Sequence, residues 1–407
     1  MTMRMRLPAG LCCLILLGFA VYRTLRLGYA DIHVRPRVAA LQRAVALDPD
    51  NSQFRALLAE TLEQEGGNGA PAMEAAIALN PWDAQARIRL GLMLEAAGDV
   101  RRAEQSLLSA ARFNRQYAPS WALANFYFRR RDEARFWPWA RRAFLMAYDD
   151  CTPLFRLCWS LTADSDRILK TAIPDRRNVL AQFLAFLLDQ NQVAGGQAVA
   201  ARLVPLAESN DTEILLRYCE RAMDGGLAAP SVGVWNRMCE RRLVPFDPLQ
   251  PARGLSLTNP SFRRPFLERC FDWRVRAPAE VSVFALTDDG GLKVAFSGRQ
   301  SEEFEILSQH MPVEPGRRYR IQFEYKTEDI PPASGLGWLV VPASGSGQPA
   351  GRSPALSSQE WRWEQFEFST PPAKAIVRLV LQYHRAPGTT RGEGWLLLRR
   401  VQCGLAG

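Results

Sequence analysis

The hydrophobic positions change their period once along the chain. Over residues 37–243 apolar residues recur every three to four positions, which is the spacing of an amphipathic helix. From Gly254 onward they alternate with polar residues, as in the run 318–326, whose apolar members are Tyr319, Ile321, Phe323 and Tyr325. Short alternating runs with turn residues between them predict the strands of a β-sandwich.

These two patterns predict a multidomain α plus β protein. We expect an α-solenoid of helix pairs over residues 37–243 and an antiparallel β-sandwich over residues 255–405. Between them, residues 244–254 hold Pro245, Pro248 and Pro251, which predicts a stiff linker. After Asp164 the helical spacing weakens, which indicates degenerate repeats or a capping array of helices.

Within the helical part a pattern repeats about every 34 residues. Residues 44–49 are echoed by residues 76–81, and residues 84–115 place small residues where helices would cross, with Gly98 at the turn. A unit of this length holds two short helices. The segment 84–115 resembles the tetratricopeptide repeat, although Arg115 stands where that family usually has Pro. The resemblance implies helix pairs that stack into a superhelix and bind a partner rather than catalyse.

The second half resembles jelly-roll carbohydrate-binding modules and the wider galactose-binding-like group. The resemblance covers about 150 residues and rests on the order of several short segments, which are 259–262 with Trp273 downstream, 308–319, 361–372 and 394–401. It implies a jelly-roll sandwich that holds glycan. One departure is that Arg399 and Arg400 precede Val401, where the family usually has an acidic pair. Because carboxylates are the usual calcium ligands, we expect no metal site.

Aromatic residues in the predicted strands are candidates for sugar binding, since sugars pack their apolar faces on aromatic rings. If Phe366, Phe368, Leu396 and Leu398 face the core, strand alternation turns Trp363 and Trp395 outward. We expect an outer binding face formed by Trp363, Trp395, Gln382 and His384, with Trp338 as a further candidate in a loop. The alternative is that these tryptophans cover the sandwich ends or pack against the helical domain.

The helical part predicts a groove for a protein partner. Short peptides lie along the concave surface of such repeats, and Asn125, Arg87 and Arg129 are our candidates for contacting one. The alternative is that the three are ordinary exposed helix positions.

The N-terminus predicts a membrane segment. Arg4 and Arg6 precede the apolar run 7–21, which is short for a spanning helix and right for the core of an export signal. Cleavage near residues 28–30 is an alternative, but Arg23 and Arg26 favour an uncleaved signal anchor over residues 1–30. Arginines on both sides leave the orientation open. From the C-terminal domain we expect a periplasmic body.

Charge and chemistry narrow the function classes. The net charge of +9 is carried almost wholly by arginine, because the chain has four lysines, and we expect no nucleic-acid partner. The chain contains His33, His310 and His384 as its only histidines and no Cys-x-x-Cys pair, which argues against a zinc site. Cys270 and Cys403 lie near the two ends of the predicted sandwich, either as a disulfide or as independent thiols.

No motif for a catalytic nucleophile, phosphate loop or dinucleotide is present, so we expect neither an enzyme nor a cofactor. With the N-terminal segment, the two resemblances imply a single-pass inner-membrane adaptor of the bacterial envelope, and by association a role in exopolysaccharide or O-antigen assembly or export. Two alternatives remain, a structural scaffold that binds no sugar and an enzyme that acts on polysaccharide.

Overall fold

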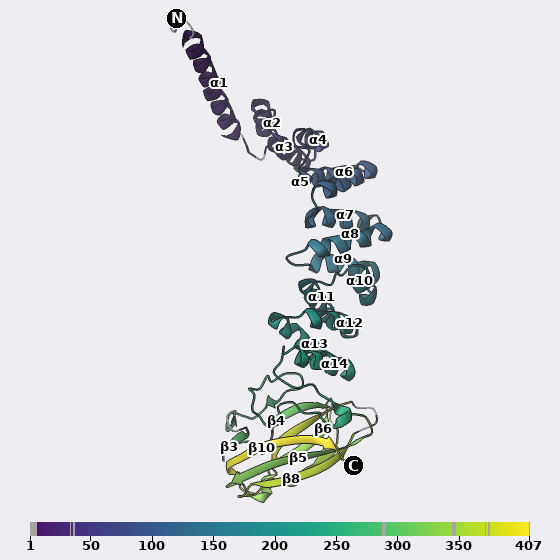
Figure 1. Ribbon diagram of the computed structural model, residues 1–407, viewed down its shortest axis with the longest axis vertical. Helices are drawn as coiled ribbons and strands as arrows, with labels where there is room; N and C mark the ends of the chain where they lie inside the picture. The colour runs from purple at the N-terminus through teal and green to yellow at the C-terminus, as the bar shows by residue number, and fades with distance from the viewer. Residues whose placement is uncertain are drawn as a thin grey trace. The chain divides into compact units, whose positions relative to one another are not determined.

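The computed structural model describes residues 6–32, 34–35, 37–286, 290–343, 347–370, 372 and 375–406. Arg4, one of the two basic residues ahead of the apolar run, lies outside the described residues. The chain divides into two compact units, Met1–Pro174 and Asp175–Gly407. The first unit is helical, and the second contains the last helices together with the β-sandwich (Figure 1).

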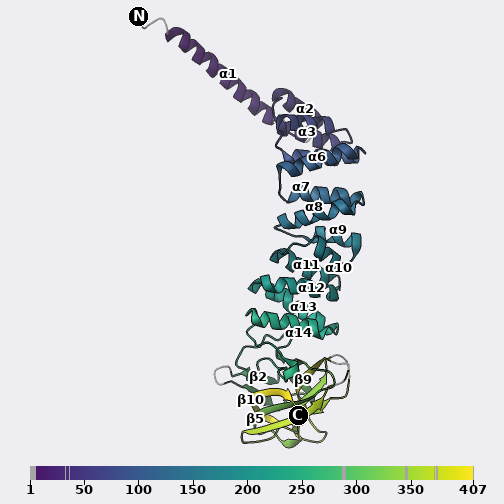
Figure 2. The ribbon, with the colours of Figure 1, turned by 45° about the vertical axis from the view of Figure 1, so that its right-hand side comes forward.

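The first unit consists of helices packed in consecutive pairs. Its helices are α1 (Arg6–Ile32), α2 (Val38–Leu47), α3 (Ser52–Gln64), α4 (Ala70–Leu79), α5 (Ala84–Ala96), α6 (Val100–Phe113), α7 (Tyr117–Arg129), α8 (Glu133–Met146), α9 (Thr152–Thr162) and α10 (Ser165–Thr171). The pairs α3–α4, α5–α6 and α7–α8 each pack together, and Figure 2 shows α7 and α8 side by side. This is the tetratricopeptide-like arrangement that the sequence predicts.

The same turn chemistry recurs from one pair to the next. Gly98 and Arg131 both have a left-handed backbone, with φ of 86° and 56°, and each precedes an aspartate that caps the next helix. Asp99 accepts from the N–H of Arg102, and Asp132 accepts from the N–H of Arg135. A capping carboxylate satisfies an N–H that has no partner within the helix. The repeat therefore depends on this turn, which tolerates arginine in place of glycine.

The second unit begins with two helix pairs and ends in the sandwich. Its elements are α11 (Arg177–Asp189), α12 (Val193–Leu203), α13 (Thr212–Asp224), α14 (Ala228–Glu240), β1 (Arg274–Val275), β2 (Val281–Ala285), β3 (Leu292–Ser297), β4 (Glu303–Pro312), β5 (Arg318–Glu328), β6 (Gly337–Pro342), β7 (Gly351–Arg352), β8 (Arg362–Ser369), β9 (Ile376–His384) and β10 (Glu393–Leu405), with short 3-10 turns between some of them.

The strands form two antiparallel sheets, in the orders β1-β4-β9-β6-β7 and β2-β3-β10-β5-β8. Alternate residues of each sheet meet in one core, which includes Tyr319, Ile321 and Phe323 from β5 and Leu396 and Leu398 from β10. The predicted fold class, helix pairs followed by an antiparallel jelly-roll sandwich, is confirmed.

The proline-rich segment 244–254 is packed and not extended away from its neighbours. The ring of Phe246 stacks on Trp235 of α14, with ring centroids 5.7 Å apart. The Asn236 side chain donates to the carbonyl of Leu249 at 2.8 Å and accepts from its N–H at 2.7 Å. At the other end the Tyr319 hydroxyl donates to the carbonyl of Pro251. The segment predicted as a linker thus fastens α14 to the sandwich.

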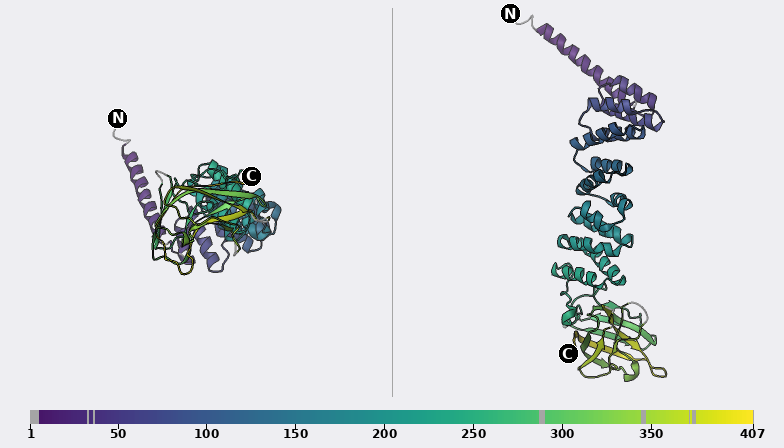
Figure 3. Two further views of the ribbon diagram at one scale, coloured as in Figure 1. Left: turned by 90° about the horizontal axis from the view of Figure 1, so that it is seen from below. Right: turned by 90° about the vertical axis from the view of Figure 1, so that its right-hand side faces the viewer.

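Helix α1 is long and apolar enough to cross a membrane. Its span Leu11–Ile32 has 22 residues and a mean hydropathy of 1.6 and belongs to one continuous helix (Figure 3). Its large apolar side chains are exposed, whereas Ala30 near its end packs against Ala44 and Phe54. The helix is continuous through residues 28–30, where the sequence offered a cleavage site. A signal sequence and a membrane span share these features.

The close crossing of α5 and α6 gives a test of the repeat packing. A Cβ at Gly91 would lie 2.7 Å from Cγ of the buried Leu107, so we expect Gly91→Ala to destabilise the protein by about 1–3 kcal/mol. Gly233 in α14 is the matched control, because a Cβ there meets nothing within 4 Å. Gly233→Ala should stabilise by about 0.5–1 kcal/mol. Urea unfolding followed by circular dichroism measures both, and a neutral Gly91→Ala would contradict the tight crossing.

Candidate binding surfaces

The predicted glycan residues lie on opposite outer faces of the sandwich. Trp363 on β8 and Trp395 on β10 belong to the β2-β3-β10-β5-β8 sheet, whereas Gln382 and His384 on β9 belong to the other sheet. Alternation is as predicted, since all four side chains lie outside the core. The single surface predicted for the four is wrong, because alternation assigns a residue to the inside or the outside but does not assign its strand to a sheet.

The face that carries Trp363 and Trp395 is rich in exposed aromatic rings. Trp363 is 52% exposed, and Phe284 on β2 is 53% exposed. Trp363 pairs with Glu324 of β5 and Trp395 with Glu328, so the two tryptophans lie two strands and four residues apart, roughly 16 Å. We call this surface, with Phe284, Trp361, Trp363 and Trp395, the tryptophan face.

Cations lie over two rings of the tryptophan face. The Lys293 ammonium lies 5.5 Å from the ring centroid of Trp395, and the Arg399 guanidinium lies 3.9 Å from that of Trp361. The electron-rich face of an aromatic ring attracts a cation. These contacts hold the rings in place and put positive charge beside them. The surface can therefore offer flat apolar area and hydrogen-bond donors together.

The opposite sheet has a small hollow beside Gln382. Its volume is about 90 Å³, and its lining includes Gly335, Leu339, Arg352, Ser353 and Gln382. His384 is the last residue of β9, the central strand of the same sheet, with Nδ1 3.3 Å from a carboxylate oxygen of Glu303. Such a volume suits a few water molecules or one small group rather than a sugar chain.

The prediction for Trp338 as a loop residue is wrong. Trp338 lies on β6, fully buried in the sandwich core, where its ring packs 6.0 Å from Trp273 and 6.2 Å from Phe323. The glycines before it suggested a loop, but Gly337 is already the first residue of β6. A residue inside the core is not available to a ligand.

Arg129, one of the three residues predicted to contact a partner, lines a hollow in the helical unit. Arg129 lies at the C-terminal end of α7 and forms two hydrogen bonds with the Glu95 carboxylate of α5, at 3.0 and 2.6 Å. Arg130 lies 3.6 Å from the same carboxylate. With Ala96 and Leu92, which is 45% exposed, these residues line an open hollow between α5 and α7. Two arginines and one glutamate leave it a net charge of +1.

Arg87 and Asn125 have local structural contacts instead. The Arg87 guanidinium donates twice to the carbonyl of Pro81 and lies over the Phe113 ring at 4.8 Å. Arg55 makes the same pair of bonds to Pro49, so this contact belongs to the repeat. The Asn125 amide donates to the carbonyl of Trp121 within α7. The sequence shows that Pro49 and Pro81 occupy equivalent positions of the repeat, but only the structure shows that an arginine bonds each carbonyl.

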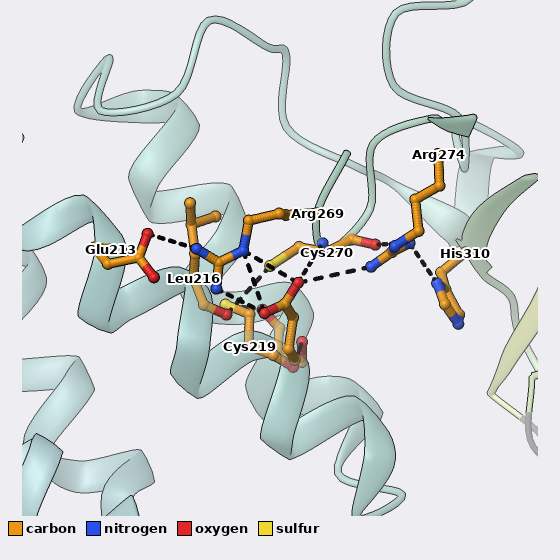
Figure 4. A network of polar contacts seen from close by, with 9 residues as sticks. Glu213, Leu216, Cys219, Arg269, Cys270, Arg274 and His310 are labelled. Atoms are coloured by element: carbon orange, nitrogen blue, oxygen red, sulfur yellow. Dashed lines mark hydrogen bonds and ion pairs between the residues drawn. The ribbon is translucent and has the colours of Figure 1, made fainter. Parts of the chain in front are cut away.

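A polar cluster joins α13 to the loop before β1 (Figure 4). No pattern in the sequence indicated it. Arg269 forms charge-assisted hydrogen bonds with Glu213 at 2.5 Å and with Glu220 at 2.7 Å. Burial acts to raise the pKa of Glu220, but the hydrogen bonds and charge of Arg269 outweigh it and hold that pKa below its usual value. Residues about 50 positions apart gave no signal of this pairing.

Next to the cluster lie two titratable groups with opposite shifts. Arg274 donates to His310 Nδ1 at 2.7 Å, and because a guanidinium cannot accept, His310 must be neutral at that nitrogen. Burial, followed by the charge of Arg274, lowers the pKa of His310 to about 4. Burial raises the pKa of Asp272 to about 6, against hydrogen bonds from the backbone N–H groups of Leu267 and Trp273. Desolvation dominates both shifts.

Metal and thiol chemistry can be stated for the described part of the chain. There, no three His, Cys, Asp or Glu side chains gather as a metal site. Cys270 and Cys403 are both free thiols, so the disulfide alternative for this pair is not formed. Cys270 packs instead against α13, where its Sγ donates to the carbonyl of Leu216 at 3.3 Å.

No protein-family model matches the chain, and no curated protein matches its sequence. Solved structures similar to part of it include a CBM4 domain, at 14% identity over 37% of this chain and all of that one, with a TM-score of 0.29. PilF of Pseudomonas aeruginosa is 14% identical over 56% of this chain and 91% of its own, with a TM-score of 0.26. YrrB, a TPR protein with an unusual peptide-binding site, is 11% identical over 51% and 94%, with a TM-score of 0.25.

The opposite shifts of Asp272 and His310 predict a hidden pH dependence. Folded Asp272 keeps its proton up to about pH 6, whereas the usual carboxyl pKa is 3.8, so its contribution to stability falls as the pH rises between these values. Folded His310 ionises near pH 4 and not 6.5, so its contribution falls as the pH is lowered through that range. Between pH 4 and 6 the two contributions oppose each other.

Removing one group should reveal the other. We expect Asp272→Asn to lose stability relative to the unaltered protein as the pH falls from 6.5 to 4, by up to about 3 kcal/mol. His310→Asn, which keeps an acceptor for Arg274, should gain stability over the same range. Urea midpoints measured at each pH test this, and parallel pH curves for all three proteins would show that neither group is shifted.

Proposed function

We propose that this chain is a non-catalytic, membrane-anchored binding protein of the bacterial envelope. Its helix pairs bind a protein partner, and the tryptophan face of its sandwich binds a sugar chain. Helix α1 supplies the membrane span, and the body lies in the periplasm. A role in exopolysaccharide or O-antigen assembly or export fits this combination, because a growing or exported polysaccharide must be held near the membrane.

The observation that carries the proposal is the tryptophan face itself. Large apolar side chains on a soluble surface are ordinary when scattered, but grouped aromatic rings mark a surface that something covers. Trp363 and Phe284 are each more than half exposed, Trp395 lies on β10 between the strands that carry them, and Trp361 directly precedes β8. Flat rings flanked by Lys293 and Arg399 offer stacking for sugar faces and hydrogen bonds for hydroxyl or carboxylate groups.

A glycan array probed with the full chain in detergent tests the sugar-binding part. We expect Trp363→Ala and Trp395→Ala each to weaken binding of a retained glycan roughly tenfold, since one lost stacking contact is worth about 1 kcal/mol or somewhat more. Trp82→Ala is the matched control, because Trp82 is 75% exposed and belongs to the other unit. Full affinity in both face variants would leave a scaffold without sugar binding at this surface.

The hollow between α5 and α7 tests the protein-binding part. A photoreactive benzoylphenylalanine at Leu92, introduced in the full chain in its native membrane, should form a discrete crosslinked adduct. Reversing charge with Arg130→Glu should reduce that adduct several-fold, because the hollow loses its net positive charge. The control is Arg142→Glu on α8, a charge reversal outside the hollow. Absence of an adduct at Leu92 would place partner binding elsewhere, and equal adduct yields in both variants would show that the charge of the hollow does not hold the partner.

A further inference from the structure

Every polar group of Cys270 has a hydrogen-bond partner, and two of the three partners lie on α13. Its N–H donates to Glu220 at 3.4 Å, its carbonyl accepts from Arg274 at 2.9 Å, and its thiol donates to the carbonyl of Leu216 at 3.3 Å. Its backbone is left-handed, with φ of 49°, which is costly for a residue other than glycine. The surrounding contacts thus hold a cysteine in a strained conformation with its sulfur toward one turn of α13.

A second thiol lies at that turn. Cys219 follows Leu216 by three residues on α13, and its own thiol donates to the carbonyl of Ser231 at 3.6 Å. Both thiols are buried, and the side chain of Cys270 points to the turn of α13 that carries Cys219 (Figure 4). A disulfide needs sulfurs about 2 Å apart with ordinary Cβ geometry, and a cysteine fixed beside that turn can approach this by side-chain rotation.

We propose that Cys219 and Cys270 form a disulfide when the chain meets a disulfide oxidant, which covalently joins α13 to the sandwich. The two thiols lose two protons and two electrons as their S–S bond forms, and the disulfide of the oxidant, a small-molecule or protein disulfide, is cleaved to two thiols. The attacking species is a thiolate. Burial raises the pKa of the Cys270 thiol far above its usual value, so the exchange takes place before the loop packs on α13.

The bond would close the loop 219–270, which includes the segment packed under α14. It would also reinforce the Arg269–Glu220 contact at the same place. Because the crosslink restricts the unfolded chain, the oxidised second unit should melt at a higher temperature than the reduced one, by roughly 5 °C or more.

Peptide mapping tests this proposal in two arms. The full chain is unfolded in urea with detergent, refolded in a glutathione buffer, quenched with N-ethylmaleimide and digested without reduction. The same quench is applied directly to the chain in its native membrane. In both arms we expect a linked peptide pair that contains Cys219 and Cys270, which Cys219→Ser abolishes and Cys158→Ser, at a buried cysteine of the other unit, leaves intact.

The two arms separate this proposal from the exported placement on which its cellular part rests. Alkylated Cys219 and Cys270 after refolding, or a link from either to Cys239, would overturn the pair. A correct link after refolding together with free thiols in the membrane would confirm the pair and overturn the periplasmic placement of the body.

Discussion

A stacked array of helix pairs always has one apolar face left over at its end, and this constraint governs the second unit. The last helix pair would leave Trp235 of α14 uncovered at the end of the array. In the structure Trp235 is fully buried, because Phe246 stacks on it and Phe271 meets it edge-on. The sandwich and the segment that leads to it therefore serve as the cap of the array. For the same reason the proline-rich segment cannot act as a hinge, since its movement would expose that tryptophan.

The arginines at this junction are paired. Arg269 lies between two carboxylates, and Arg274 turns its guanidinium to a neutral imidazole and a backbone carbonyl. Burying a charge without a partner is costly, and breaking one member of such a set exposes the cost of the other. Asp272 follows the same rule by holding its proton rather than its charge. The junction combines apolar capping with fixed polar partners, which restricts the contact between α13 and the sandwich to one arrangement.

The two surfaces proposed for binding differ from the junction in how far their apolar groups are covered. In the sandwich, rings that face the core are packed by other rings, as Trp338 is, while those on the tryptophan face are covered only in part by cations. In the helical unit the hollow at Arg129 and Arg130 keeps an exposed leucine beside paired charges. Both surfaces leave apolar area open where stability alone would favour covering it, which is the physical basis for assigning them to partners.

The sequence by itself determined the secondary structure, its order and the inward or outward direction of strand residues, because periods of 3.6 and 2 follow from local geometry. It predicted the repeat turn at Gly98 and the outward Trp363 and Trp395. Only the tertiary structure decided which sheet each strand joins. Gln382 and His384 therefore lie on the other sheet from Trp363 and Trp395, and Trp338 lies in the core. It also decided the junction of Glu220 with Arg269 and of Leu216 with Cys270, since contacts between residues about 50 positions apart leave no periodic trace in the sequence.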